Sequence, residues 1–454
     1  MKSFYLFLTY LTLTIYTICA FGQSKTFSKE QMCGDIDVLF STIEKVHPNM
    51  YSVYPKQELT KDVEKIKSDL KTEGDVFYFY KQITPLVAKL GDGHTSVSFP
   101  FDYLKTDTAV LLFPFAVKIT YPDSAVIVIN DYTPDRNAIP KGAQITSINN
   151  RSANDIVSEM MNYQSGEKDF FKMEVLKSYF TPLIYTLYGD AIFDIEYMFE
   201  QNKYSIQVKG ISYTERYRPQ QQTVSEPEKY YTFSVLPDKN IGIIKFRYFI
   251  GDNKTFAQFL DSTFRVMQKE KIENLIIDIR ENGGGSTMFG DFLFQYISPS
   301  PFQQFGKVIV KYSKIQKQVN RYIFGLKFPN GTTHTFKNKL IKLRKNELRY
   351  KGNIFLLTSH YTFSAGASFS WAFKYFKMGT VIGEETGGLA VTFGDVITQK
   401  LPCTEIVYRI SYKKFYQYGA TDKDTHGTLP DYDVKAENAM DFAIDLIMNK
   451  TVRP

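Results

Sequence analysis

Ser364 stands in a setting that suits a nucleophile. It follows an apolar stretch at 353–358, which is typical of a buried strand, and it precedes a helical apolar pattern that runs to Phe376. A serine at such a junction lies beside the unpaired N–H groups of a helix start, which suit a developing oxyanion. The residues at 365–368 are small, so a substrate carbonyl can approach the backbone closely. The alternative interpretation is structural, because serine is also a favoured N-cap.

A serine hydroxyl needs a base at neutral pH, and the chain offers five histidines. We favour His94, because it belongs to the glycine-rich turn GDGHT at 91–95, where backbone freedom can aim an imidazole. A purely turn-stabilising role is the alternative for this histidine. His47 precedes a proline at the end of a helical pattern and is interpreted as structural. His360 is close to Ser364 in sequence, which does not by itself place the two within hydrogen-bonding distance.

Three consecutive glycines follow a second apolar strand pattern, at 275–280. They belong to the segment ENGGGS at 281–286, whose backbone N–H groups a turn would expose. A phosphate-binding loop would need a following Gly-Lys-Ser/Thr or the dinucleotide glycine spacing, and the sequence has neither. We therefore expect this turn to donate an N–H group to an oxyanion hole.

The elements that must position these residues fall into successive regions of the sequence. Residues 1–22 have a charged start, a short apolar run and small exit residues, which are typical of a secretory signal peptide. Residues 23–102 show helical periodicity, residues 103–212 show short strands between turns, and residues 213–454 alternate helices with apolar strands. We expect an α/β multidomain fold with an N-terminal helical domain, a β-rich domain and an α/β core whose sheet is mostly parallel.

The segment 138–150 resembles the PDZ pattern, in which a small residue after glycine leads into a strand and an asparagine turn. PDZ domains bind extended peptide ends by adding a strand to a sheet edge, and a plain β-rich spacer is the alternative here. Along the chain, the patterns predict helices at 61–70, 76–90, 153–162, 256–270 and 436–448, and strands at 110–113, 125–129, 241–246, 275–280 and 353–358.

Several motifs occur in a fixed order along the chain. They are GDGHT at 91–95, DIRENGGG at 278–285, FSAG at 363–366, GEETGG at 383–388 and GTLPDYDV at 427–434. With these motifs the chain resembles the carboxyl-terminal processing (tail-specific) serine peptidase family over nearly the whole mature length. The resemblance implies a crotonase-like catalytic core, hydrolysis of peptides or proteins through an acyl-enzyme, and no cofactor or metal.

The resemblance also implies which base activates the serine. The Ser-Lys branch of the family has its lysine where this chain has Glu385, and no lysine lies nearer to that position than Lys377 or Lys400. The tricorn-like branch uses a histidine from the N-terminal side of the core, which matches His94, together with a distal carboxylate. Alignment on the last motif places Asp424 at that carboxylate, with Asp422 and Glu385 as alternatives.

The mechanism expected from these assignments is acyl transfer. His94 takes the proton of Ser364, which attacks the peptide carbonyl, and the resulting imidazolium then protonates the leaving amine. The N–H groups of Ala365 and Gly284 are expected to hold the oxyanion, with Gly283 as the alternative to Gly284.

Composition limits the partners and the compartment. The formal charge of +7 is modest for 454 residues, and no nucleic-acid-binding module is recognisable. No stretch after the signal approaches the ~20 apolar residues of a membrane span, so we expect a secreted or periplasmic chain without stable membrane insertion. Beyond the signal only Cys33 and Cys403 remain, and whether they pair stays open.

Two non-enzymatic functions remain as alternatives. One is a catalytically idle protein that binds apolar ligands in the same core, and the other is a peptide-binding scaffold that works through the PDZ-like segment. An intact Ser364 and His94 favour the peptidase over the idle binding protein, whereas the scaffold predicts unchanged function in Ser364→Ala.

Overall fold

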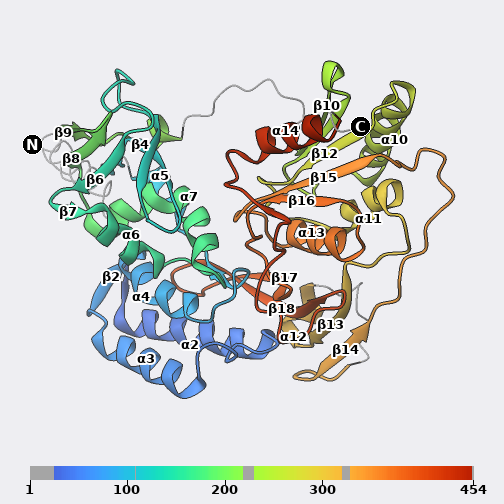
Figure 1. Cartoon of the computed structure of the whole chain (residues 1–454). Helices are drawn as coiled ribbons and strands as arrows, with labels where there is room; N and C mark the ends of the chain where they lie inside the picture. The colour runs from blue at the N-terminus through green and yellow to red at the C-terminus, as the bar shows by residue number, and fades with distance from the viewer. Residues whose placement is uncertain (1–24, 108, 218–229, 320–327, 452–454) are drawn as a thin grey trace, which may run out of the picture.

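The computed structural model describes residues 25–107, 109–217, 230–319 and 328–451 (Figure 1). The predicted signal peptide at 1–22 lies outside the described residues. Within the described ranges, no helix combines the length and the apolar character that crossing a bilayer requires.

The first region is helical, as its apolar periodicity predicts. It contains β1 (Thr26–Ser28), α2 (Lys29–Val46), α3 (Lys56–Asp69), β2 (Glu73–Asp75) and α4 (Val76–Ala88). A capping box starts α2, because the Ser28 hydroxyl accepts from the Gln31 N–H and the Gln31 side chain accepts from the Ser28 N–H. The glycine turn of 91–95 follows the end of helix α4, so the helix fixes the position from which His94 reaches the rest of the molecule.

An antiparallel sheet forms the second region. Its strands are β4 (Phe115–Ile119), β5 (Val126–Asp131), β6 (Gln144–Ile148), β7 (Arg151–Ser152), β8 (Ile192–Phe199) and β9 (Asn202–Lys209). They run in the order β4-β5-β6-β8-β9, with β7 beside β6. Along β8, Phe193, Ile195 and Tyr197 are buried and alternate with more exposed residues, which is the period of a sheet with one covered face.

The helices of this region are α5 (Phe101–Thr106), α6 (Ala153–Met161), α7 (Asp169–Tyr188) and α8 (Tyr213–Arg216). Helix α6 matches the predicted helix at 153–162, whereas α7 was not predicted. The strand predicted at 110–113 is wrong: Leu112 makes one isolated bridge to Ile211, and β4 starts only after Pro114. A proline restricts the residue before it and cannot donate to a ladder, which separates 110–113 from the sheet. The PDZ-like assignment stays a prediction.

A mostly parallel sheet forms the third region, as predicted. Its order is β10 (Tyr231–Leu236), β11 (Ile241–Phe246), β12 (Asn274–Asp278), β15 (Asn353–Thr358), β16 (Thr380–Gly383) and β19 (Tyr432–Asp433). Only β10 pairs antiparallel within this sheet. A short 3-10 helix, η1 (Pro237–Lys239), joins β10 to β11.

Helices cover both faces of this parallel sheet. One face packs against α10 (Asn253–Lys269), α11 (Thr287–Ile297) and α13 (Ala365–Tyr375), and the other packs against α14 (Ala439–Thr451) (Figure 1). The strands read as continuous apolar runs because both of their faces are buried. Each βα connection therefore places its loop at the carboxyl edge of the sheet, where Ser364 and the glycine turn meet.

A second, antiparallel sheet joins the helical region to the core. It contains β14 (Thr333–Lys337), β13 (Phe305–Lys311), β18 (Val407–Gln417) and β17 (Val391–Lys400), with α12 (Lys314–Val319) after β13. The short strand β3 (Ser96–Val97) pairs with β18. In Figure 1, β17 and β18 lie between the N-terminal helices and the parallel sheet. This pairing brings the residues that follow His94 to the core.

Candidate active site

Ser364 has a strained backbone at the start of α13. Its φ is 51° and its ψ is −123°, a region that a residue with a Cβ rarely occupies. The serine stands at the N-cap position, yet its hydroxyl makes no capping hydrogen bond. Its Oγ lies instead 3.0 Å from Nε2 of His94. The geometry therefore favours the nucleophile over the N-cap interpretation, and the strain resembles the exposed turn on which other hydrolases display a serine.

Small residues let the glycine turn approach the serine. Gly284 has a φ of 111°, and a Cβ added there would lie 2.6 Å from the Ser364 Cβ. The Phe363 N–H donates to the Asn282 carbonyl at 3.0 Å, which ties the two loops together. A Cβ on Gly366 would lie 2.9 Å from the same carbonyl oxygen. Glycine is thus required at both contacts for this close packing.

The imidazole of His94 is held on two sides. One side is the contact with Ser364, and the other is the ring of Phe363, whose centroid lies 4.6 Å from that of His94 at an interplanar angle of 27°. Phe363 stacks in turn on Phe171 of α7, at a centroid distance of 4.1 Å. Burial lowers the pKa of His94 below its ordinary value, although the nearby Asp92 carboxylate opposes this shift. A neutral imidazole is the form that a general base needs.

Asp92 fixes the turn that carries His94. Its Oδ1 accepts from the His94 N–H at 2.8 Å, and its Oδ2 accepts from the Thr95 hydroxyl at 2.6 Å. His47 Nε2 lies 3.1 Å from the same Oδ2, while His47 Nδ1 accepts from the Asn49 N–H. The pKa of the Asp92 carboxyl lies below its ordinary value, because hydrogen bonds from His47 and Thr95 outweigh the opposing effect of burial.

The three carboxylates predicted from the motifs do not contact His94 among the described contacts. Asp424 accepts from the N–H and hydroxyl of Thr421, so its carboxylate caps its own turn. Asp422 accepts from Lys414 and Tyr416, and Glu385 accepts from the Gly427 N–H. The carboxylate that does approach His94 is Asp92, whose Oδ1 lies 3.9 Å from Nδ1.

The predicted oxyanion donors are placed differently from one another. Ala365 is the first residue of α13 and lines the pocket at Ser364. The Gly284 N–H, in contrast, donates to the Asn282 side chain at 2.9 Å. Gly285 lines the pocket, whereas Gly283 packs toward the Tyr361 hydroxyl.

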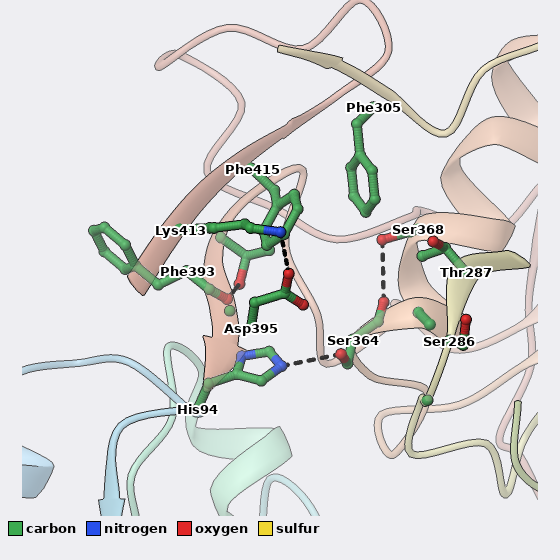
Figure 2. A pocket seen from close by; sticks show the side chains of 14 residues that line it. His94, Ser286, Thr287, Phe305, Ser364, Ser368, Phe393, Asp395, Lys413 and Phe415 are labelled. Carbon is green, nitrogen blue, oxygen red and sulfur yellow. Dashed lines mark hydrogen bonds and ion pairs between the residues drawn. The ribbon is translucent and has the colours of Figure 1, made fainter. Parts of the chain in front are cut away.

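A pocket of about 620 Å³ opens beside Ser364 and His94, the two residues called the dyad below. Figure 2 shows Ser364 and His94 at one side of it, with Phe305, Phe415 and an ion pair between Lys413 and Asp395 around the remainder. The pocket is large enough for a substrate side chain next to the scissile bond. In the described part of the chain, no group of three or more His, Cys, Asp or Glu side chains converges as a metal site would require.

Comparisons with known proteins identify the family of the segment that contains Ser364. Residues 240–434 match the model of peptidase family S41. The core segment 240–434 is that of a peptidase of family S41. This family consists of serine-type peptidases, and the match includes Ser364 and the glycine turn but not His94.

Individual S41 relatives are distant. A tail-specific protease of Haemophilus influenzae is 26% identical over 163 residues, which make up 35% of this chain and only 19% of the relative. The structure of mature CPAF complexed with lactacystin has a TM-score of 0.64 at 12% identity, covering 93% of this chain and 97% of that one. A second structure of mature CPAF has a TM-score of 0.64 at 13% identity, with 93% and 96% covered. At these identities the structures establish a shared fold.

Sequence reasoning missed several residues that surround the dyad of this S41 chain. Asp92 was visible inside GDGHT but received no role, because sequence does not show that its carboxylate accepts from His47, 45 residues away. Phe363 was visible beside Ser364, although its stacking on His94 was not. Nothing in the sequence pointed to Phe171, whose helix was not predicted.

Proposed function

We propose that this S41 serine-type peptidase is an endopeptidase in which Ser364 is the nucleophile and His94 the general base. The observation that carries the proposal is the 3.0 Å contact between Ser364 Oγ and His94 Nε2 across 270 residues of sequence. That distance suits direct transfer of the hydroxyl proton to the imidazole. The strained backbone of Ser364 supports the same role, because nothing about helix capping requires it.

The catalytic steps follow from the positions of these groups. His94 removes the Ser364 proton while Oγ attacks the peptide carbonyl, and the imidazolium then donates that proton to the leaving amine. Water then attacks the acyl-enzyme: His94 removes a proton from the water and donates it to Ser364 Oγ as the acyl group leaves as the carboxylic acid. The Ala365 N–H at the start of α13 is one oxyanion donor. The second donor comes from the turn at 283–285. The Gly284 N–H donates to the Asn282 side chain, so this bond must break before Gly284 can donate to the oxyanion; otherwise a neighbouring amide of the turn is the donor.

The carboxylate that orients His94 is, in this proposal, Asp92 rather than Asp424. A base that accepts through Nε2 carries its hydrogen on Nδ1, and Asp92 Oδ1 is 3.9 Å from that atom. Asp92 also fixes the backbone of His94 by accepting from its N–H. A negative charge at this position stabilises the imidazolium that forms during attack.

Substrate and location complete the proposal. The substrates are peptides or unfolded protein segments, and residues 103–212 act as a PDZ-like domain that binds extended peptide ends. The chain acts outside the cytoplasm, as a secreted or periplasmic protein after removal of residues 1–22.

A labelling experiment tests the nucleophile directly. The mature chain is treated with a fluorophosphonate, and hydrolysis of an unfolded protein such as casein is measured in parallel. Ser364→Ala should abolish labelling and lower hydrolysis by at least about a thousandfold. The matched control is Ser286→Ala, because Ser286 is an exposed serine of the same pocket and should leave labelling intact. Full hydrolysis by Ser364→Ala would favour the catalytically idle binding protein over the peptidase.

A further inference from the structure

Glu167 occupies a junction of three chain segments beside the dyad. It lies just before α7, and its carboxyl group reaches both the turn of His94 and the strand β17. Its Oε2 accepts from the Gly93 N–H at 3.3 Å, and its Oε1 lies 3.1 Å from Oγ1 of Thr392. These partners are 74 and 225 residues away in sequence, so one side chain joins parts of the molecule that have no local reason to stay together.

The contacts of the Thr392 hydroxyl can all be satisfied together when Glu167 is protonated. The Thr392 hydroxyl lies 3.1 Å from Glu167 and also 3.1 Å from the Phe393 carbonyl oxygen, yet it carries one hydrogen. An ionised Glu167 would leave one of these acceptors without that hydrogen. A protonated Glu167 donates to Thr392, which then donates to Phe393, while the Gly93 N–H still reaches the other carboxyl oxygen. The neutral form therefore satisfies every contact.

The charges around Glu167 favour the same form. Burial and the repulsion of Asp92 raise the pKa of Glu167 to about 8. Lys172, on the same segment, pairs with Asp169 instead. Other ionisable side chains on the segments packed here are His94 on the turn, His47 behind Asp92, Lys168 beside Glu167, and Asp395 and Lys400 on β17.

We propose that Glu167 is a positioning residue for His94: in its protonated form it ties the His94 turn to β17 and keeps the imidazole against Ser364. This inference rests on the proposed peptidase function. Phe171, one helical turn further along, reinforces the arrangement because it stacks on Phe363, which stacks on His94. The segment 166–171 thus contacts the neighbours of both catalytic residues, through Gly93 on one side and Phe363 on the other.

Loss of the Glu167 proton would disturb this arrangement in two ways. The Thr392 hydroxyl could no longer satisfy both of its acceptors, and a second negative charge would stand next to Asp92 in a poorly hydrated site. We expect the His94 turn to shift away from Ser364. Peptidase activity should consequently decline as the pH rises through about 8, the pKa of Glu167.

The experiment compares pH profiles of kcat/KM for the full mature chain and two variants. Glu167→Gln mimics the protonated carboxyl, because its amide donates to Thr392 and its carbonyl accepts from Gly93. This variant should keep kcat near the wild-type value at pH 7, and its kcat/KM should not decline near pH 8. Glu167→Ala should lower kcat by about tenfold or more with KM nearly unchanged, since misplacement of a catalytic group acts on the chemical step. Glu174→Gln is the control and should retain the wild-type profile, because Glu174 is a half-buried residue of α7 that pairs with Lys177 and does not line the pocket at Ser364.

Two results would overturn the inference. One is a Glu167→Gln profile that still declines near pH 8 like the wild type. The other is wild-type kcat in a Glu167→Ala chain that unfolds at the wild-type temperature. If Glu167→Ala fails to fold, the Glu167→Gln profile alone decides. These outcomes are separate from failure of the peptidase proposal, which would appear as undiminished hydrolysis in Ser364→Ala.

Discussion

Replacing Asp92 with alanine should both destabilise the protein and disable His94. The carboxylate is 1% exposed and accepts from three donors: the His94 N–H, the Thr95 hydroxyl and His47 Nε2. Removal of one hydrogen-bond partner from a buried donor costs about 1–3 kcal/mol. Because the Thr95 hydroxyl can rotate toward another acceptor, two donors stay unpaired and we expect a total loss of about 2–6 kcal/mol. This is a large part of the ~5–15 kcal/mol that stabilises a typical domain.

The measurement is urea unfolding followed by tryptophan fluorescence. The chain has one tryptophan, Trp371, which lies in α13 close behind Ser364, so its emission reports on the catalytic core. Asp92→Ala is compared with Asp92→Asn, which keeps one acceptor and should lose less stability. Asp69→Ala is the control, because Asp69 is exposed at the end of α3 and should leave the unfolding midpoint unchanged.

The pH dependence gives a second check on Asp92. A carboxyl whose pKa is lowered by folding adds stability above its unfolded pKa of about 3.9, and that contribution disappears as the pH falls through the folded value. The part of the stability difference between wild type and Asp92→Asn that comes from the ionised Asp92 should therefore shrink as the pH falls below about 4. A loss under about 1 kcal/mol for Asp92→Ala, with fluorophosphonate labelling intact, would refute the assignment of Asp92 as the residue that holds His94.

Three further predictions concern the dyad and its surroundings. Gly284→Ala should abolish fluorophosphonate labelling while the chain still folds, because the new Cβ would stand 2.6 Å from the Ser364 Cβ; retained labelling would mean that the loops can separate. Asp92→Asn should lower kcat more than Asp424→Asn, since Asp424 caps its own turn; the reverse order would restore the assignment drawn from the motifs. Because burial lowers the pKa of His94, kcat/KM should stay constant as the pH falls through the ordinary histidine value of about 6.5 and decline only below it. An acid limb centred above that value would contradict the buried, neutral imidazole.

The fold was predictable where a pattern is local. Continuous apolar runs predicted β11, β12 and β15, since strands buried on both faces need apolar residues at every position. Helix α7 was missed because buried residues occur all around it, from Phe170 to Thr186, and leave no amphipathic period. The strand predicted at 110–113 is absent although its side chains are buried, because these side chains pack in the core without their backbone joining a sheet.

The sequence by itself was enough to predict Ser364 as the nucleophile, since small residues before a helix and a glycine turn in a fixed motif order require no knowledge of long-range contacts. The same motifs predicted His94 as its base. Only the tertiary structure placed a carboxylate near that histidine, because β3 pairing with β18 and the Asp92 hydrogen bonds set the distances. Asp424 lies close to its motif in sequence yet bonds within its own turn. Distances between distant segments depend on packing, and a sequence motif carries no record of them.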